Sequence, residues 1–447
     1  MKKVKTLLSI ITFLMFLSSL SFANGLNLNG IGARAVAMGG AFVGLADDFT
    51  AVFWNPAGIA QFNKKYFGFY GTDIIPSMSY TLEAPTAIGP VTLADAESVN
   101  KHYLAGLASY YHPLSEDLVA GIAVYAPSGL GIEWEGADLA NISGPPTFLP
   151  NPNIDWRSKI FVLSISPALA YKVNDQFMVG ATLNINYGSF KTAQYAGAAE
   201  VQLPTYPYPT LYFDLGQQTL DMTGWGFGAT FGVLVKPSEM FSIGATFRTP
   251  SKISFSGETV VSGIDQLAPI VGSIDTTANV EADVTWPMWL AFGIAFKPIE
   301  NFTLTADIQY TQWSKVDVIE ISFTDPTWAA LMEITEGNKL ELNWESKTQI
   351  RFGAEYWLSE KFALRAGYYF DPGPAPNKTR NILLPITDFN SFAFGIGYNI
   401  DGLTIDLGVE YLIGKDKDIA FGQYESAMPG LYALKIFCLE LSLGYGW

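Results

Sequence analysis

Cysteine and histidine are almost absent from the sequence, which contains one cysteine, Cys438, and two histidines, His102 and His112. A single cysteine cannot form an internal disulfide, so we expect the fold to hold without one and Cys438 to act as a small apolar side chain. Two histidines, near the two ends of one expected strand, supply neither a metal-binding pattern nor a Ser/His pair for a hydrolase. The sequence therefore predicts a protein that is not an enzyme and has no metal or other cofactor.

Charge is also scarce. Only 15% of the residues are charged, whereas soluble globular proteins average about 25%. The formal net charge of −16 argues against nucleic acid as a partner, because phosphate binding needs an excess of Lys and Arg. After Leu20 the chain has no run of about 18 apolar residues, so we expect no membrane-spanning helix there. Yet 49% of the chain is hydrophobic and 14% aromatic.

Residues 1–23 have the features of a secretory signal peptide. A lysine-rich start is followed by an apolar run from Leu7 to Leu20, and small residues stand at the −3 and −1 positions of a cleavage site after Ala23. We therefore expect export and cleavage at that point. An exported chain with few charges and no spanning helix is best explained by a closed β-barrel, which satisfies its backbone hydrogen bonds internally and can sit in lipid.

Alternating polarity predicts the strands of such a barrel. Between Phe302 and Trp313 every second side chain is apolar, and the residues between them are Thr, Asp or Gln. The same period of two appears at 177–187 and 403–411, whereas a helix would show a period near 3.6. We expect one side of each strand to face lipid and the other to face the lumen.

The connections alternate between short polar turns and long segments rich in Gly, Pro, Asn and Asp. The short turns lie at 112–117, 173–176, 236–240, 297–301, 359–361 and 399–402, and the long segments at 75–100, 128–154, 193–220, 259–281, 322–343, 372–387 and 416–431. This asymmetry is typical of barrels with tight periplasmic turns and long extracellular loops. It predicts an all-β fold: a transmembrane up-and-down antiparallel barrel of about fourteen strands in the lipid of the bacterial outer membrane.

The last segment, Leu439–Trp447, alternates in polarity and ends on an aromatic residue. It resembles the signal that the bacterial barrel-assembly machinery recognises, so that machinery is an expected partner during biogenesis. The aromatic end could instead be incidental. Nothing in the sequence calls for oligomerisation, and we expect a monomer.

Residues 24–62 do not follow the alternation. They are rich in glycine and small side chains, have no side suited to lipid, and end in Asn55-Pro56-Ala57-Gly58. A barrel of about fourteen strands is too wide to be filled by its own side chains, since about eight strands already reach that limit. We therefore predict that residues 24–62 form a plug, or hatch, inside the barrel of residues 63–447.

Several motifs carry a resemblance to a known family. In the hatch segment they are Gly32-x-Arg34, Met38-Gly-Gly-Ala41, Ala46-Asp47-Asp48 and Trp54-Asn55-Pro56-Ala57; later ones are Tyr125-Ala-Pro-Ser-Gly-Leu-Gly-Ile-Glu133, Trp286-Pro-Met-Trp-Leu290, Tyr310-Thr-Gln-Trp-Ser314 and Asp371-Pro-Gly-Pro-Ala-Pro-Asn377 with Leu384-Pro385. Together they resemble the FadL family of long-chain fatty-acid transporters, including its toluene- and xylene-uptake relatives. The likeness covers essentially the whole mature chain.

The resemblance implies passive uptake of a hydrophobic small molecule, a fatty acid or a hydrocarbon. Extracellular loops would capture the ligand, a site in the lumen beside the hatch would bind it, and a kinked strand would let it leave sideways. Pro127, Gly129 and Gly131 are the candidates for that kink, with a plain turn at a strand end as the alternative.

Other candidate residues follow from the same resemblance. In the hatch, Asn55 and Pro56 would lie at the inner ligand site, although Asn-Pro is also a common turn former. Arg34, Asp47 and Asp48 are hatch residues, and the two aspartates could position the hatch by pairing with an inward basic residue such as Arg365, or they could be solvated.

A fatty-acid carboxylate needs a basic partner in an otherwise apolar site. Lys191 and Lys347 are candidates, but each fits better an interfacial lysine whose stem lies along apolar surface. Where the family's inner-site lysine would align, this chain has Leu342, which keeps neutral hydrocarbons open as ligands. Apolar residues in the long segments are candidates for an outer capture groove or for a self-packed loop cluster: Trp134, Leu139, Phe148 and Leu211.

Two other functions remain alternatives at this stage. A porin for polar solutes needs an open lumen, which the predicted hatch opposes. A structural or adhesive surface barrel would use its loops to bind a partner and would not transport hydrophobic compounds.

Overall fold

The computed structural model describes residues 25–143, 150–202, 210–335 and 337–447. The predicted signal peptide at 1–23 and the candidate Phe148 lie outside this range. The strands are β1 (Tyr66–Thr86), β2 (Gly89–Glu97), β3 (Tyr103–Pro113), β4 (Leu118–Trp134), β5 (Trp156–Asn174), β6 (Phe177–Tyr195), β7 (Ala198–Gln202), β8 (Thr210–Asp214), β9 (Gln217–Ser238), β10 (Phe241–Arg248), β11 (Ser251–Val261), β12 (Thr277–Trp286), β13 (Trp289–Ile299), β14 (Phe302–Thr311), β15 (Val318–Phe323), β16 (Lys339–Glu341), β17 (Lys347–Trp357), β18 (Phe362–Asp371), β19 (Phe389–Ile400), β20 (Leu403–Gly414), β21 (Lys417–Ile419) and β22 (Gly430–Gly446).

The helices are all short. They are α2 (Ala33–Ala37), α3 (Ala51–Trp54), α4 (Ala268–Val271), α5 (Pro326–Thr335) and the 3-10 turns η1 (Pro56–Gln61), η2 (Ala140–Ile142), η3 (Ile264–Leu267), η4 (Trp313–Lys315) and η5 (Asn377–Thr379). Within the described residues, no helix is both long and apolar enough to cross a membrane.

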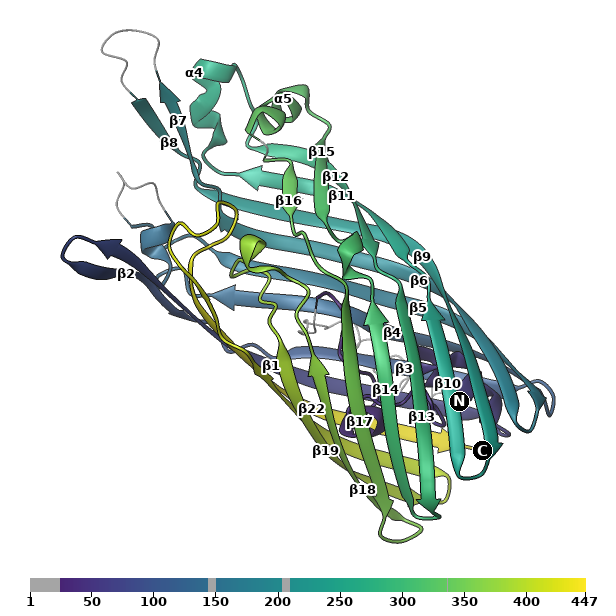
Figure 1. Ribbon diagram of the computed structural model, residues 1–447. Helices are drawn as coiled ribbons and strands as arrows, with labels where there is room; N and C mark the ends of the chain where they lie inside the picture. Colours follow the sequence, from purple (N-terminus) through teal and green to yellow (C-terminus); the bar gives the residue numbers. More distant parts are fainter. Residues whose placement is uncertain (1–24, 144–149, 203–209, 336) are drawn as a thin grey trace, which may run out of the picture.

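In the part of the chain that the structure describes, 14 antiparallel strands close into a barrel, which confirms the predicted fold (Figure 1). Six of these strands are interrupted and carry two labels each: β2 with β3, β10 with β11, β12 with β13, β14 with β15, β16 with β17, and β20 with β21. For example, β10 and β11 both pair with β9. The ring closes where β1 pairs with β22, from Tyr66 opposite Gly446 to Thr81 opposite Leu431.

At the level of the hatch, the wall has its apolar side outward and its polar side inward. In β14, Leu304 and Ile308 are exposed, whereas Thr305, Asp307 and Gln309 are buried in the lumen. This is the alternation that the sequence predicts, and it is the pattern of a strand whose outer side faces lipid.

The two ends of the barrel differ, as the loop lengths predict. Short turns join the strands at one end, and the other end carries α4, α5 and the β7–β8 hairpin (Figure 1). The long segments are more regular than expected, because β1 continues to Thr86, β4 continues to Trp134 and β9 begins at Gln217. Backbone pairing in hairpins therefore continues where the sequence, rich in Gly and Pro, predicts loops.

The N-terminal segment lies inside the lower half of the barrel (purple in Figure 1). Its helices α2 and α3 and the turn η1 are almost entirely buried. Glycines on the inner side of the wall let the hatch backbone approach closely. A Cβ atom at Gly244 would collide with the carbonyl oxygen of Val43, and one at Gly367 with the backbone of Met38 and Gly39.

Candidate ligand-binding lumen

Polar side chains of the wall hold the hatch backbone. The carboxylate of Asp307 accepts hydrogen bonds from the N–H groups of Phe42 and Val43, each at 3.0 Å. On the neighbouring strand, Arg351 donates to the carbonyl of Gly39 at 3.1 Å. Hydrogen bonds to charged groups contribute more than neutral ones, so these contacts fix the position of a segment that has little regular structure of its own.

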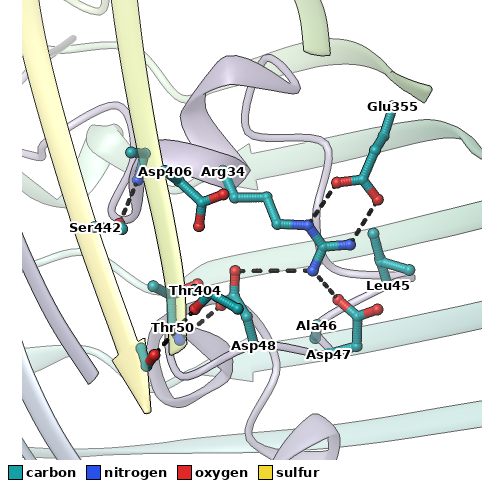
Figure 2. A network of polar contacts seen from close by, with 12 residues as sticks. Arg34, Leu45, Ala46, Asp47, Asp48, Thr50, Glu355, Thr404, Asp406 and Ser442 are labelled. Atoms are coloured by element: carbon teal, nitrogen blue, oxygen red, sulfur yellow. Dashed lines mark hydrogen bonds and ion pairs between the residues drawn. The ribbon is translucent and has the colours of Figure 1, made fainter. Parts of the chain in front are cut away.

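Arg34 is the main ionic link between hatch and wall (Figure 2). Its guanidinium donates two hydrogen bonds of 2.8 Å to the two carboxylate oxygens of Glu355 on β17. A third nitrogen lies 2.5 Å from Asp47 and 4.0 Å from Asp48, both within the hatch. The Arg34 side chain thus links helix α2 to the aspartates further along the hatch, and links the hatch to the barrel wall.

The expected pairing of Asp47 and Asp48 with Arg365 is wrong. Arg365 binds Glu355 and Asp406, at 2.7 Å each, and reaches the hatch only through Glu355. The two aspartates bind Arg34 instead, because the hatch folds back so that they face their own neighbouring helix.

Burial shifts the pKa values of charged side chains in the hatch. Burial raises the pKa of Asp48 from 3.8 to about 6, against the opposing effect of Arg34 and of hydrogen bonds from Thr50. Burial alone would lower the pKa of Arg34, but the carboxylates of Asp47 and Glu355 raise it above its ordinary value. Arg34 therefore stays charged, while burial holds the pKa of Asp48 above the ordinary value of a carboxyl group.

Asn55 has the environment of a turn former. It is fully buried, its amide nitrogen donates to the carbonyls of Val43 and Val233 at 3.0 Å each, and its oxygen accepts from the N–H of Ala57 at 3.1 Å. Pro56 begins the turn η1 and is buried too. Since these contacts use both N–H groups of the amide and its oxygen accepts a bond within the turn, ligand contact by Asn55 or Pro56 stays a prediction that the geometry does not favour.

Above the hatch lies a small apolar cavity of about 10 Å3, lined mostly by buried side chains. All of its lining residues are hydrophobic: Leu26, Ile160, Phe190, Phe255, Val284, Trp286, Ile319, Leu340, Leu342, Trp344 and Leu384. Leu342, which stands where the family's lysine was expected, is part of this lining. The walls come from strands on opposite sides of the barrel, so the cavity lies within the lumen.

A second cavity, of about 30 Å3, lies between the first one and the hatch. Its lining is mostly polar or aromatic: Asn27, Leu28, Asn29, Phe53, Trp54, Arg248, Trp289, Gln309, Thr311, Trp313, Gln349 and Arg351. Trp313 of this cavity packs edge-on against Trp344 of the apolar one, with ring centroids 5.3 Å apart. Sequence analysis missed Arg248, although it shares the lumen-facing parity of Ser242 and Thr246 in β10.

The third strand of the barrel, β4, is irregular where the sequence predicts a kink. Its pairing with β3 ends at Tyr125, and its register with β5 shifts between Tyr125 and Ser128, where Pro127 lies. Beyond this point its free edge is bridged by the N-terminal segment: Asn27 pairs with Ser128.

The kink is also tied to the lumen by side chains. The indole of Trp286 donates to the hydroxyl of Ser128 at 2.9 Å, which donates to Asn27 at 3.1 Å. A side chain at Gly131 would press against the ring of Tyr103, 3.1 Å from the added Cβ. The role of Pro127, Gly129 and Gly131 in ligand exit stays a prediction.

The lysine candidates lie away from both cavities. Lys191 is half exposed and pairs with Asp221 at 2.6 Å, and Lys347 pairs with Glu345 at 2.7 Å. Each ammonium group already has a carboxylate partner, and neither residue lines the apolar or the polar cavity.

The loop candidates separate into two groups. Trp134 and Leu139 are buried in the apolar cluster of the upper lumen, where the indole of Trp134 donates to the carbonyl of Ile382 at 3.1 Å. Leu211 on β8 is exposed at 40% and is available at the surface. A capture role for these residues stays a prediction.

Among the described residues, no group of three or more His, Cys, Asp and Glu side chains is arranged to hold a metal ion. Cys438 is a buried free thiol. The described part of the lumen can therefore bury the apolar surface of a ligand next to a few polar groups that are held in place.

Comparisons with known proteins agree with this architecture. The family model described as outer membrane protein transport protein (OMPP1/FadL/TodX) matches residues 14–435. The long-chain fatty acid transport protein of Salmonella typhi is 23% identical over 431 residues, 93% of each chain. Outer membrane protein P1 of Haemophilus influenzae is 24% identical over 413 residues, 85% of this chain and 84% of that one.

Solved structures share the fold. A FadL homologue of Pseudomonas aeruginosa matches with a TM-score of 0.76 and 16% identity, over 94% of this chain and 99% of that one. The toluene transporter TodX of Pseudomonas putida matches with a TM-score of 0.69 and 16% identity, over 95% and 99%. The chain belongs to the OMPP1/FadL/TodX family of outer-membrane transport proteins for hydrophobic compounds.

Proposed function

We propose that this protein takes up hydrophobic compounds, long-chain fatty acids or related lipids and hydrocarbons, across the outer membrane by passive diffusion. Apolar surface at the long-loop end captures the compound, the lumen binds it above the hatch, and it leaves sideways at the kink in β4. The observation that carries the proposal is a wholly apolar cavity in the lumen above the hatch. With it goes the interruption of β4, whose pairing with β3 ends at Tyr125.

Physical chemistry supports each step. Burial of apolar surface contributes about 25 cal/mol per Å2, so an apolar lumen concentrates such a solute without any energy source. The hatch blocks a straight aqueous path. A sideways exit leads into the hydrocarbon of the membrane, where the solute is soluble.

The relatives support the same substrate range. One relative is named for long-chain fatty acids and one structural neighbour for toluene. A polar-solute porin is disfavoured by the buried hatch, and a purely adhesive barrel gives no reason for an apolar cavity in the lumen.

The bulge in β4 provides a test of lateral exit. Three steps along β4, from Tyr125 to Ser128, face two steps along β5, so deletion of Pro127 would restore the register. We expect this deletion to lower the rate of hydrophobic uptake into cells about tenfold or more, with the barrel still folded. Deletion of Ala87, at the tip of the β1–β2 hairpin, is the matched control. Unchanged uptake after deletion of Pro127 would refute lateral exit at this strand.

A further inference from the structure

Three basic side chains, Arg157, Lys159 and Lys191, form a cluster on the outer wall of the barrel. On the outer side of β5 the residues from Phe161 to Tyr171 are apolar, and the next two outward positions toward the long-loop end are Lys159 and Arg157, both exposed. Lys191 on β6 lies directly opposite Lys159 in the ladder. Like charges directly opposite each other destabilise a sheet, so the stability of the barrel does not explain this basic cluster.

Aromatic side chains place the basic cluster at the level of the lipid head groups. Tyr187 on β6 and Trp225 on β9 are directly opposite each other, with ring centroids 5.0 Å apart, and Trp225 is 55% exposed. Both lie closer to the periplasmic turns than Lys191 does. Outward Tyr and Trp side chains mark the boundary between hydrocarbon and head groups in such barrels. The basic cluster lies just beyond this boundary, in the outer leaflet.

A polar groove of about 450 Å3 opens on the outer wall beside the basic cluster. It begins at Asp221, which pairs with Lys191 at 2.6 Å, and it crosses β9, β11 and β12, which lie side by side (Figure 1). Its lining includes Thr223, Ser256, Glu258, Asn279, Glu281 and Thr324. Hydroxyl, amide and carboxylate groups are suitable hydrogen-bond partners for the hydroxyl groups of a sugar.

The basic cluster and the groove are close enough to bind one head group. Lys159, Lys191, Asp221 and Glu258 are successive partners across β5, β6, β9 and β11. Three strand spacings correspond to about 14 Å. This is the length scale of a phosphorylated disaccharide.

We propose that the outer wall from β5 to β12 binds a phosphorylated glycolipid of the outer leaflet. A phosphate lies at the basic cluster, where it relieves the repulsion between Lys159 and Lys191, the sugars occupy the groove, and the acyl chains lie along the apolar wall beside Tyr187 and Trp225. The carboxylates of the groove would repel a phosphate, so the phosphate lies toward β5 and the sugars toward β12. This inference goes beyond the uptake function, because it concerns a lipid that stays outside the lumen.

The test measures lipid binding by native mass spectrometry on the full mature chain, refolded in detergent so that it carries no cellular lipid. The probes are lipid A with both of its phosphates, the same lipid A with its phosphates removed, and phosphatidylglycerol, which has a phosphate and no sugar. The buffer contains EDTA, so that no divalent cation can bridge the phosphate to the carboxylates. We expect the wild type to bind intact lipid A about tenfold tighter than either of the other probes.

Two variants divide the site. The double variant Lys159→Gln, Lys191→Gln should weaken intact lipid A about tenfold and leave dephosphorylated lipid A within about twofold. Ser256→Trp fills the groove from an exposed position. It should weaken both forms of lipid A and leave phosphatidylglycerol unchanged.

The matched control is the double variant Lys315→Gln, Lys435→Gln, which removes two exposed lysines from η4 and β22, away from the groove. It should bind intact lipid A within about twofold of wild type. Heat-modifiable gel mobility reports whether each barrel is folded.

Several outcomes would overturn the inference, and none of them bears on hydrophobic uptake. Unchanged lipid A binding after loss of Lys159 and Lys191, or an equal loss in the control, would show that the basic cluster does not bind the phosphate. Binding that appears only with magnesium would also exclude direct contact with the lysines. Equal affinity of the wild type for lipid A and phosphatidylglycerol would exclude a sugar site. If the double variant does not fold, the wild type decides, and equal binding of intact and dephosphorylated lipid A overturns the inference.

Discussion

The upper and lower parts of the lumen are held together by different forces. Above the hatch, a continuous apolar cluster fills the barrel, including Phe255, Trp286 and Leu342. At the level of the hatch, Arg34 and Glu355 lie at the centre of a network of charge-assisted hydrogen bonds. Apolar contacts are non-directional, so one apolar surface can replace another in them. The ionic contacts require particular partners at fixed distances.

This difference assigns a role to each region. A ligand can replace apolar contacts in the upper lumen at little cost, because the replacement contacts are of the same kind. The hatch is held by contacts that solvent or an apolar ligand cannot reproduce in the same geometry. We therefore expect changes in the lower lumen to alter leakage and stability, and changes in the upper lumen to alter ligand binding.

The largest expected effect comes from removing the hatch. Deletion of residues 25–62 would leave a barrel of 14 strands that its own side chains cannot fill. We expect large, steady ion currents in planar bilayers, where the intact protein gives almost none. Equal currents from both forms would show that the hatch does not seal the lumen. Gel mobility should confirm that the shortened chain is folded.

Loss of the Glu355 charge should have the next largest effect. Glu355→Gln leaves Arg34 and Arg365 without their shared carboxylate, and removing one partner of a buried ion pair costs about 3–5 kcal/mol. We expect a lower urea midpoint and intermittent ion currents. Glu345→Gln, at the exposed pair with Lys347, is the control and should change stability by less than about 1 kcal/mol. Similar losses in the two variants would contradict a special role for the lower network.

A close approach of two backbones gives the third prediction. Gly367→Ala would place a Cβ against the hatch backbone at Gly39, whereas Gly71→Ala would meet only the Phe69 ring at 3.7 Å. Overpacking costs about 1–3 kcal/mol, so we expect Gly367→Ala alone to lower the urea midpoint and increase leakage. Equal behaviour of the two alanine variants would mean that the hatch does not press on the wall there.

Acid should stabilise the hatch through Asp48. Its pKa in the folded protein is raised by burial from 3.8 to about 6, so the folded state binds the proton more tightly than the unfolded state. Stability from this group is therefore greatest below about pH 4 and falls as the pH rises through about 6. The full shift corresponds to about 3 kcal/mol, and we expect about 1–2 kcal/mol because Asp48 retains some solvent contact.

Asp48→Asn isolates that contribution. The amide oxygen can still accept the hydrogen bonds from Thr50 that Asp48 accepts, at 2.8 Å from its N–H and 2.5 Å from its hydroxyl, but it does not titrate. The difference in unfolding free energy between wild type and variant should grow in favour of the wild type as the pH falls from about 7 to 5. A difference that stays constant with pH would contradict the raised pKa.

The wall of the barrel could be predicted from sequence because its signals are local. Alternation over ten residues, as in 302–311, and the order of short and long connections are properties of neighbouring positions. The interruption of β4 at Pro127 is local too, since Pro and Gly disturb the strand in which they lie.

The contacts of the hatch could not be predicted in the same way. Arg34 and Glu355 are 321 residues apart in the chain, and their meeting depends on how an irregular segment folds inside a closed barrel. The expectation that Asp47 pairs with Arg365 failed for this reason. The position of Arg248 could have been predicted, because it lies on the same side of β10 as Ser242 and Thr246, but its place beside the hatch could not.

The smallest expected effect sharpens the contrast between surface and lumen cations. Lys191 and Lys347 are already paired with Asp221 and Glu345, and exposed pairs contribute less than about 1 kcal/mol. We expect the double variant Lys191→Gln, Lys347→Gln to bind the fatty-acid anion hexadecanoate within about twofold of wild type when each protein is titrated in lipid nanodiscs. A tenfold loss would place the carboxylate of the ligand at the outer ends of the strands, because only a direct ion pair with the ligand could give these already paired lysines such an effect.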